Sequence, residues 1–194
     1  MFNNLSPVVR NLLIINVVVF IIQKLMPVST YYLALYDIHS PYFKPYQFFT
    51  YMFAHGDFFH ILFNMMAFAS IAPVLEMYWG DKKFLLFYLA TGIGAGAIYA
   101  LVNFFLFPGA GGSMLGASGA LYGVLMAFGM IFPNMEVSLF FIPVRAKYLV
   151  FVIGGLTFLM DRSGKVAHLA HFGGAFVGFL LVTFWRGQGT GRRG

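Results

Sequence analysis

The fold of this chain is decided by residues 55–79, which read HGDFFHILFNMMAFASIAPVLEMYW. This stretch can cross a hydrocarbon core of about 30 Å, which needs about 20 mostly apolar residues in one helix. Within it His60 and Asn64 are four residues apart and therefore share one helix face. Polar side chains inside a membrane span are costly and mark functional candidates. The stretch thus predicts a membrane helix that presents a polar site.

Five further apolar stretches accompany this one. The six predicted spans are residues 8–25, 55–79, 84–107, 116–132, 147–160 and 166–185. We predict an all-α, polytopic membrane protein with six transmembrane helices in one domain, residues 1–186. A short basic Gly/Arg tail follows at residues 187–194, and we expect it to be disordered. No small-residue cleavage site follows the first span, so we expect a retained helix rather than a signal peptide.

The composition excludes several classes of soluble protein. Of the 194 residues, 60% are hydrophobic, 9% are charged and none is cysteine. A typical soluble chain has about 25% charged residues. So few charges exclude an ordinary soluble enzyme, a disordered chain and a nucleic-acid-binding domain. Without cysteine there is no disulfide framework, thiol nucleophile or Cys-ligated metal.

The distribution of basic residues predicts the orientation of the spans. Six spans place both termini on one side of the membrane. Eight basic residues fall on that side: Arg10, Lys82, Lys83, Arg145, Lys147, Arg186, Arg192 and Arg193. Four fall on the other: Lys24, Lys44, Arg162 and Lys165. The excess predicts cytoplasmic termini. The aromatic-rich first loop, residues 27–54, then faces outward, and we expect it to pack at the bilayer interface.

The fourth and sixth spans complete a candidate site. Residues 116–120, GASGA, place the Ser118 hydroxyl among small residues. On the sixth span His171 shares a helix face with Gly174 and Gly178, and these glycines form a GxxxG pattern. Such small residues let helix backbones approach closely. The spacing predicts that the imidazole of His171 reaches the hydroxyl of Ser118.

A Ser–His pair is sufficient to hydrolyse a peptide bond. The base takes the serine proton during attack and later protonates the leaving amine. No acid is placed to complete a triad, so we predict a dyad whose imidazole is oriented by ring contact with Tyr122. The tetrahedral intermediate needs hydrogen-bond donors. We expect these to be the side chains of His60 and Asn64 and the backbone N–H groups of Ser118 and Ala117.

Each of these features also has a structural interpretation. A lone serine can bond back to its own helix, an HxxxN pair can link helices, and glycine faces can serve packing alone. A metal site is also suggested by four histidines, His55, His60, His168 and His171. However, the HExxH motif and cysteine ligands are absent. We therefore predict no metal and no cofactor. We expect Glu76 to bond backbone amides of a neighbouring loop.

Together the motifs resemble those of the rhomboid family of intramembrane serine proteases. Residues 60–64 are similar to its H-x-x-x-N, residues 116–119 to its G-x-S-G and residues 170–174 to its A-H-x-x-G. They occur in the family's order, on the second, fourth and sixth spans, and the similarity extends from about Tyr46 to Gly178. The resemblance implies a rhomboid-like bundle whose short, central fourth helix carries the nucleophile Ser118 at the bottom of a water-filled cavity, with His171 as general base.

The resemblance also implies the roles of neighbouring residues. His60, Asn64 and backbone amides, including that of Ala117, would form the oxyanion site, and Tyr122 would pack on the histidine. Gly116 belongs to the serine motif, and His55 would match a further histidine that precedes H-x-x-x-N. This chain has Tyr46-Gln47 where the family often has Trp-Arg in its first loop.

For function, the resemblance implies an intramembrane serine endopeptidase. Its partners would be the lipid bilayer and single-span membrane-protein substrates, without nucleic acid or metal. We expect a multi-pass protein of a bacterial inner membrane, with cytoplasmic termini and an active site that opens to the outer side. A proteolytically dead relative that only binds membrane proteins is one alternative, and a small transporter or channel is another.

Overall fold

The computed structural model describes residues 6–107, 112–139, 142–160 and 165–190. Six main helices dominate them: α1 (Pro7–Leu25), α4 (Phe58–Trp79), α5 (Asp81–Leu106), α6 (Ser118–Ile131), α7 (Ala146–Met160) and α8 (Lys165–Thr190). Each coincides with one predicted span, so the prediction of an all-α, polytopic bundle is confirmed. Helix α8 continues through residues 187–190 of the predicted tail, and residues 191–194 lie outside the described part.

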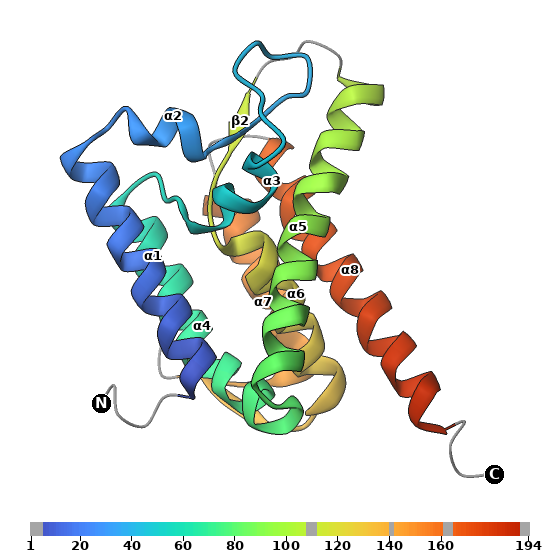
Figure 1. The fold of residues 1–194 in the computed structure, drawn as a ribbon. Coiled ribbons are helices and arrows are strands. Elements are labelled where there is room, and N and C mark those ends of the chain that lie inside the picture. Colours follow the sequence, from blue (N-terminus) through green and yellow to red (C-terminus); the bar gives the residue numbers. More distant parts are fainter. Residues whose placement is uncertain (1–5, 108–111, 140–141, 161–164, 191–194) are drawn as a thin grey trace.

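The helices differ in their ability to cross a bilayer. By length and composition, four suffice among the described residues: α1, α4, α5 and residues 168–187 of α8. Helix α6 and the stretch Ala146–Thr157 of α7 are apolar but shorter. Helix α6 contacts α4, α5, α7 and α8 and lies in the centre of the bundle, starting well below the upper end of α5 (Figure 1). Helix α1 begins and α8 ends at the lower end, as an even number of crossings requires.

Two carboxylates define where helices begin. Asp57 caps α4 because its Oδ1 accepts a hydrogen bond from the His60 backbone N–H at 2.9 Å. The helix therefore starts at Phe58, three residues after the predicted start. Glu76 accepts from the backbone N–H groups of Val8 and Val9, both at 2.8 Å. It thus bonds backbone amides as predicted, but they belong to the start of α1 rather than to a neighbouring loop.

The first loop folds into short elements at the upper end of the bundle. These are α2 (Ser29–Leu33), β1 (Leu35–Tyr36), α3 (Gln47–Thr50) and the 3₁₀ helix η2 (Tyr51–Phe53). Strand β1 pairs antiparallel with β2 (Ser113–Met114), which joins the first loop to the segment that precedes α6. A hairpin of β3 (Glu136–Leu139) and β4 (Ile142–Arg145) connects α6 to α7.

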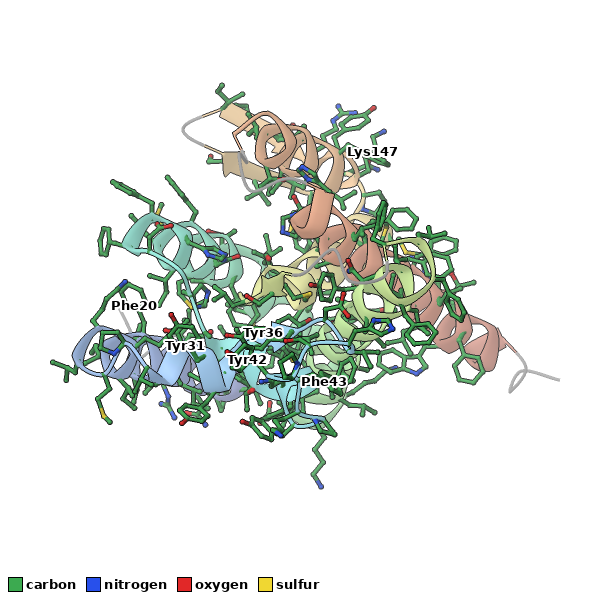
Figure 2. The ribbon with its side chains drawn as sticks, turned by 90° about the horizontal axis from the view of Figure 1, so that it is seen from above. Phe20, Tyr31, Tyr36, Tyr42, Phe43 and Lys147 are labelled. Carbon is green, nitrogen blue, oxygen red and sulfur yellow. The ribbon has the colours of Figure 1, made fainter. Side chains whose placement is uncertain are left out.

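Aromatic side chains of this loop remain exposed. Tyr31, Tyr32 and Tyr42 are each more than 60% exposed. Seen from above, Tyr31, Tyr36, Tyr42 and Phe43 lie in a row across the side of the molecule formed by α1 and α5 (Figure 2). The expectation that these amphipathic rings pack at a bilayer interface stays a prediction.

Gln47 stabilises the same loop from inside. It is buried, its Oε1 accepts from the Lys44 backbone N–H at 3.0 Å, and its Nε2 donates to the Tyr42 carbonyl at 3.1 Å. A neutral amide with one acceptor and two donors can satisfy both backbone groups. The Gln47 side chain therefore closes the loop between residues 42 and 47.

Candidate active site

Two side chains from different helices meet inside the bundle. Ser118 is the first residue of α6, and His171 lies in the second turn of α8. The Oγ of Ser118 and the Nε2 of His171 are 2.9 Å apart, which is hydrogen-bonding distance. Both residues are half-buried. The structure thus brings together the two residues that the sequence spacing placed in contact.

Small residues make this approach possible. A Cβ on Gly174 would overlap the backbone carbonyl of Gly119, and one on Gly178 would lie 2.9 Å from the Cα of Gly123. Helices α6 and α8 therefore touch backbone to backbone along their glycine faces. The predicted close approach of these faces is confirmed. On its other side Gly119 abuts α5, where its Cβ would lie 2.9 Å from the Cβ of Ala95.

The ring of His171 rests on that of Tyr122. The two rings are stacked, with centroids 4.3 Å apart and 9° between their planes. The Tyr122 hydroxyl shares a 2.7 Å hydrogen bond with Thr157 Oγ1 on α7. Ring contact between Tyr122 and the histidine was predicted, whereas Thr157 was missed. Its signal was a hydroxyl within the apolar run of residues 149–160.

His60 approaches the site beside Gly116. The backbone of Gly116 has a φ of 132°, a conformation that L side chains rarely adopt. A Cβ there would stand 2.8 Å from His60 Nε2 and 3.5 Å from Ser118 Oγ. Both atoms therefore lie close to the Gly116 backbone, and a side chain there would clash with the His60 ring. The role of His60 as an oxyanion donor stays a prediction.

Asn64 lies one turn further along α4. Its side chain is buried, and its Nδ2 donates to the carbonyl of His60 at 2.9 Å. A side-chain amide carries two N–H donors, so this bond uses one of them. The Asn64 amide is therefore anchored to its own helix, and its role as an oxyanion donor stays a prediction.

His55 is buried and packs against the ring of His60. It is 1% exposed, and its ring meets that of His60 edge to face, with centroids 5.1 Å apart. Burial, and then the neighbouring His60, lower the pKa of His55 to about 3, while the backbone of Phe53 opposes the shift. The ring is therefore neutral at physiological pH. Its backbone N–H donates to Gln23 Oε1 at 2.9 Å, which ties this segment to α1.

The segment before Ser118 is held from both sides by the first loop. The N–H of Gly116 donates to the carbonyl of Tyr51 at 2.9 Å, and the Tyr51 hydroxyl donates to the carbonyl of Gly92 on α5. The β1–β2 pairing adds a second attachment a few residues earlier. We did not predict the part played by Tyr51, and no sequence periodicity reveals a contact between two such short segments.

Three carboxylates among the described residues bond to groups away from the dyad. Asp57 caps α4, and Glu76 bonds the start of α1. Asp37 accepts from the His39 Nδ1 at 3.0 Å in the first loop. In the described part of the chain, no three side chains of His, Asp and Glu gather as a metal-binding group. The candidate site consists of the Ser118 hydroxyl and the His171 imidazole, supported by the aromatic ring of Tyr122.

Comparison with known proteins finds similarity to one family. The model of the Rhomboid domain matches residues 42–188. The chain is 33% identical over 137 residues to Rhomboid protein 1, mitochondrial, of Saccharomyces cerevisiae, an alignment covering 66% of this chain and 38% of that protein. It is 32% identical over 123 residues to Rhomboid protease GluP of Bacillus subtilis, covering 63% of this chain and 22% of that protein. The similarity thus spans well under half of each of these relatives.

Proposed function

This chain belongs to the rhomboid family of intramembrane proteases, and we propose that it is a serine endopeptidase with a Ser118–His171 dyad. It hydrolyses peptide bonds in or near transmembrane segments of membrane proteins. The observation that carries the proposal is the 2.9 Å contact between Ser118 Oγ and His171 Nε2. In a bilayer such a pair is costly to maintain for packing alone.

The proposed reaction proceeds in two halves. Ser118 Oγ attacks the scissile carbonyl carbon while His171 Nε2 accepts the hydroxyl proton, which requires the tautomer with hydrogen on Nδ1. The tetrahedral intermediate collapses, the C–N bond breaks, and His171 gives its proton to the leaving amine. Water then attacks the acyl ester, His171 takes and returns a proton in the same way, and Ser118 is released with the carboxylic acid product.

We assign stabilisation of the oxyanion to donors around Gly116. His60 Nε2 and Ser118 Oγ both lie near Gly116. The first N–H groups of a helix have no partner within it, and α6 has no side-chain cap at its start. The N–H of Ser118, with that of Ala117 just before it, can therefore point at developing negative charge, and the second Asn64 N–H adds a donor.

Tyr122 takes over the orienting role that an acid has in a catalytic triad. Its ring lies parallel to His171 and is fixed in turn by the hydrogen bond to Thr157. A stacked neutral ring restricts the imidazole to one plane without placing a second charge in the membrane. This arrangement favours a dyad over a triad. It also favours a protease over a channel, because a channel would need polar groups along a continuous path.

Our proposals for the substrates and the location draw on the same geometry. The dyad lies at the upper half of the bundle, where α6 begins, so single-span membrane proteins would present an unwound helix end to it. The excess of basic residues on the side of the termini supports cytoplasmic termini and a site that opens outward. A bacterial inner membrane fits this arrangement and the similarity to the Bacillus subtilis protease, although the yeast relative is mitochondrial by name.

A cleavage assay tests the proposal. The purified chain in detergent is expected to cleave a model single-span substrate, and a fluorophosphonate is expected to label Ser118. Ser118→Ala should abolish both signals, and His171→Ala should be about as inactive as the double variant, because members of one catalytic unit are strongly non-additive. Circular dichroism confirms that each variant is folded. Cleavage by folded Ser118→Ala at the wild-type rate would overturn the assignment.

A further inference from the structure

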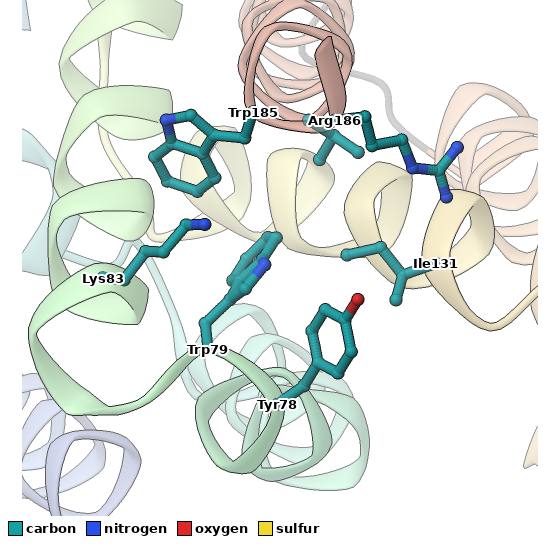
Figure 3. A pocket seen from close by; sticks show the side chains of 7 residues that line it. Tyr78, Trp79, Lys83, Ile131, Trp185 and Arg186 are labelled. Carbon is teal, nitrogen blue, oxygen red and sulfur yellow. The ribbon is translucent and has the colours of Figure 1, made fainter. Parts of the chain in front are cut away.

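A pocket of about 480 Å³ lies at the opposite end of the bundle from the dyad, bordered by the ends of α4, α5, α6 and α8. Its lining includes Tyr78, Trp79, Lys83, Ile131, Trp185 and Arg186 (Figure 3). Ser118 is the first residue of α6 and Ile131 the last, so at 1.5 Å per residue the two sites are roughly 20 Å apart. The pocket is therefore separate from the catalytic machinery.

The charge of the pocket is positive. The ammonium of Lys83 points into the hollow, whereas the Arg186 guanidinium extends from the opposite rim away from Lys83 (Figure 3), and no carboxylate is among the described residues that line it. The Nζ of Lys83 lies 4.3 Å from the centre of the Trp185 ring and 5.9 Å from that of Trp79. Arg186 donates through one nitrogen to the Met130 carbonyl, and a guanidinium has five N–H donors in all. An anion with several oxygen acceptors is the complementary ligand.

The position of the pocket points to a membrane lipid. Both tryptophans of the chain line it, with ring centroids 5.3 Å apart and nearly perpendicular planes. Tryptophan and tyrosine gather at the level of lipid headgroups. Beside the lining residues, Met77 and Phe184 are 73% and 60% exposed, which suits contact with acyl chains. A lipid would thus place its phosphate at the basic pocket and its chains against exposed apolar side chains such as these.

We propose that this pocket binds the phosphate group of an anionic membrane lipid beside the Lys83 ammonium, next to Trp79 and Trp185 and with Arg186 at the opposite rim. Its volume is in the range of small-molecule sites, which suits a headgroup. A lipid bound there bridges four helices, including the two that carry the dyad, and stabilises their packing because it binds only the folded bundle. The proposal does not depend on protease activity.

Binding can be measured with the full chain in a neutral detergent. Because both tryptophans line the pocket, intrinsic fluorescence reports its occupancy, and the midpoint of thermal unfolding reports stabilisation. Phosphatidylglycerol should change the emission to saturation and raise the unfolding temperature. Lys83→Gln/Arg186→Gln should bind roughly 25-fold more weakly, since each basic residue near an anionic lipid contributes about fivefold. Lys82→Gln, which removes the adjacent exposed lysine that does not line the pocket, should weaken binding clearly less than Lys83→Gln does.

Other arms identify the source of the phosphate. Phosphatidylcholine, whose phosphate is neutralised by its own cation, and soluble glycerol phosphate should each produce little change at the same concentration. Equal stabilisation by glycerol phosphate would overturn the lipid assignment, and equal weakening by Lys82→Gln would overturn the pocket. If the double variant does not fold, Lys83→Gln alone tests the pocket, because Lys83 makes only ring contacts among the described interactions. We expect it to bind the lipid about fivefold more weakly.

Discussion

Gly174 on α8 packs directly on the backbone carbonyl of Gly119 on α6, with no room for a side chain between them. Gly119 follows Ser118, and Gly174 lies one turn after His171. The closest approach of the two helices therefore occurs beside the dyad. The 2.9 Å distance between hydroxyl and imidazole is a consequence of this backbone contact.

Gly174→Ala should consequently separate the dyad. The added methyl group forces the helices apart, and a displacement of about 1 Å can lower the rate roughly 10²-fold. Overpacking should also reduce the free energy of unfolding by about 1–3 kcal/mol. Substrate cleavage and thermal unfolding in detergent measure the two effects. Unchanged cleavage would show that the helices can separate without moving the dyad.

Gly155→Ala on α7 is the matched control. A Cβ at Gly155 has no neighbouring atom within 4 Å. The substitution should leave activity unchanged and raise the free energy of unfolding by about 0.5–1 kcal/mol, because alanine is the better helix former. A loss of activity equal to that of Gly174→Ala would point to a general response of membrane helices to alanine rather than to this contact.

The sequence was sufficient to predict the helices and the meeting of the dyad because both depend on strong local patterns. Membrane-length apolar runs define the spans, and glycines spaced along one face define which helices touch. The β1–β2 pairing and the Tyr51 support of Gly116 were missed because two-residue ladders have no periodicity. The hydrogen-bond partner of Glu76 was also missed. A carboxylate in a span indicates a need for hydrogen-bond donors, but the sequence does not indicate which helix supplies them.

The hydrogen bond between Tyr122 and Thr157 should contribute to catalysis by fixing the ring under His171. Tyr122→Phe keeps the ring and loses the bond, and Thr157→Val loses the same bond from the other side. We expect each to lower kcat severalfold, with the double variant no worse than either. Tyr122→Leu also removes the stacked ring, worth about 0.5–1.5 kcal/mol, and should cost up to about 10-fold more. Fully additive effects of Tyr122→Phe and Thr157→Val would disprove coupling through this bond.

Asn64→Ala should lower kcat more than it raises KM. Its amide would act on charge that develops in the transition state, so substrate binding changes little. Loss of one oxyanion donor costs roughly 10²–10³ in rate when few donors are present, and we expect about 10–10²-fold here because several donors share the charge. Steady-state kinetics with a model substrate separate kcat from KM.

Asn103→Ala supplies the control for Asn64. Asn103 is also buried, and its Nδ2 also donates to a carbonyl four residues earlier, that of Tyr99 at 2.8 Å. It lies on α5 and is not part of the dyad's surroundings described above. Both variants therefore lose the same kind of bond, and only Asn64→Ala should lose kcat. Equal kinetic effects would assign Asn64 to helix stability.

Acid should destabilise the protein through His55. Its pKa is about 3 in the folded state and about 6.5 in an unfolded chain. Between these values the unfolded state binds one proton more, so the free energy of unfolding falls as pH is lowered below about 6.5, by up to about 1.4 kcal/mol per pH unit. The contribution is fully present above pH 6.5.

Thermal unfolding in detergent between pH 7.5 and about 4.5 measures the slope. Since other histidines also titrate, the quantity to compare is the difference in slope between wild type and His55→Gln, whose side chain does not titrate. We expect a clearly flatter slope in His55→Gln, whatever its absolute stability. Identical slopes would mean that His55 takes up its proton without unfolding, and that its environment admits water as the pH falls.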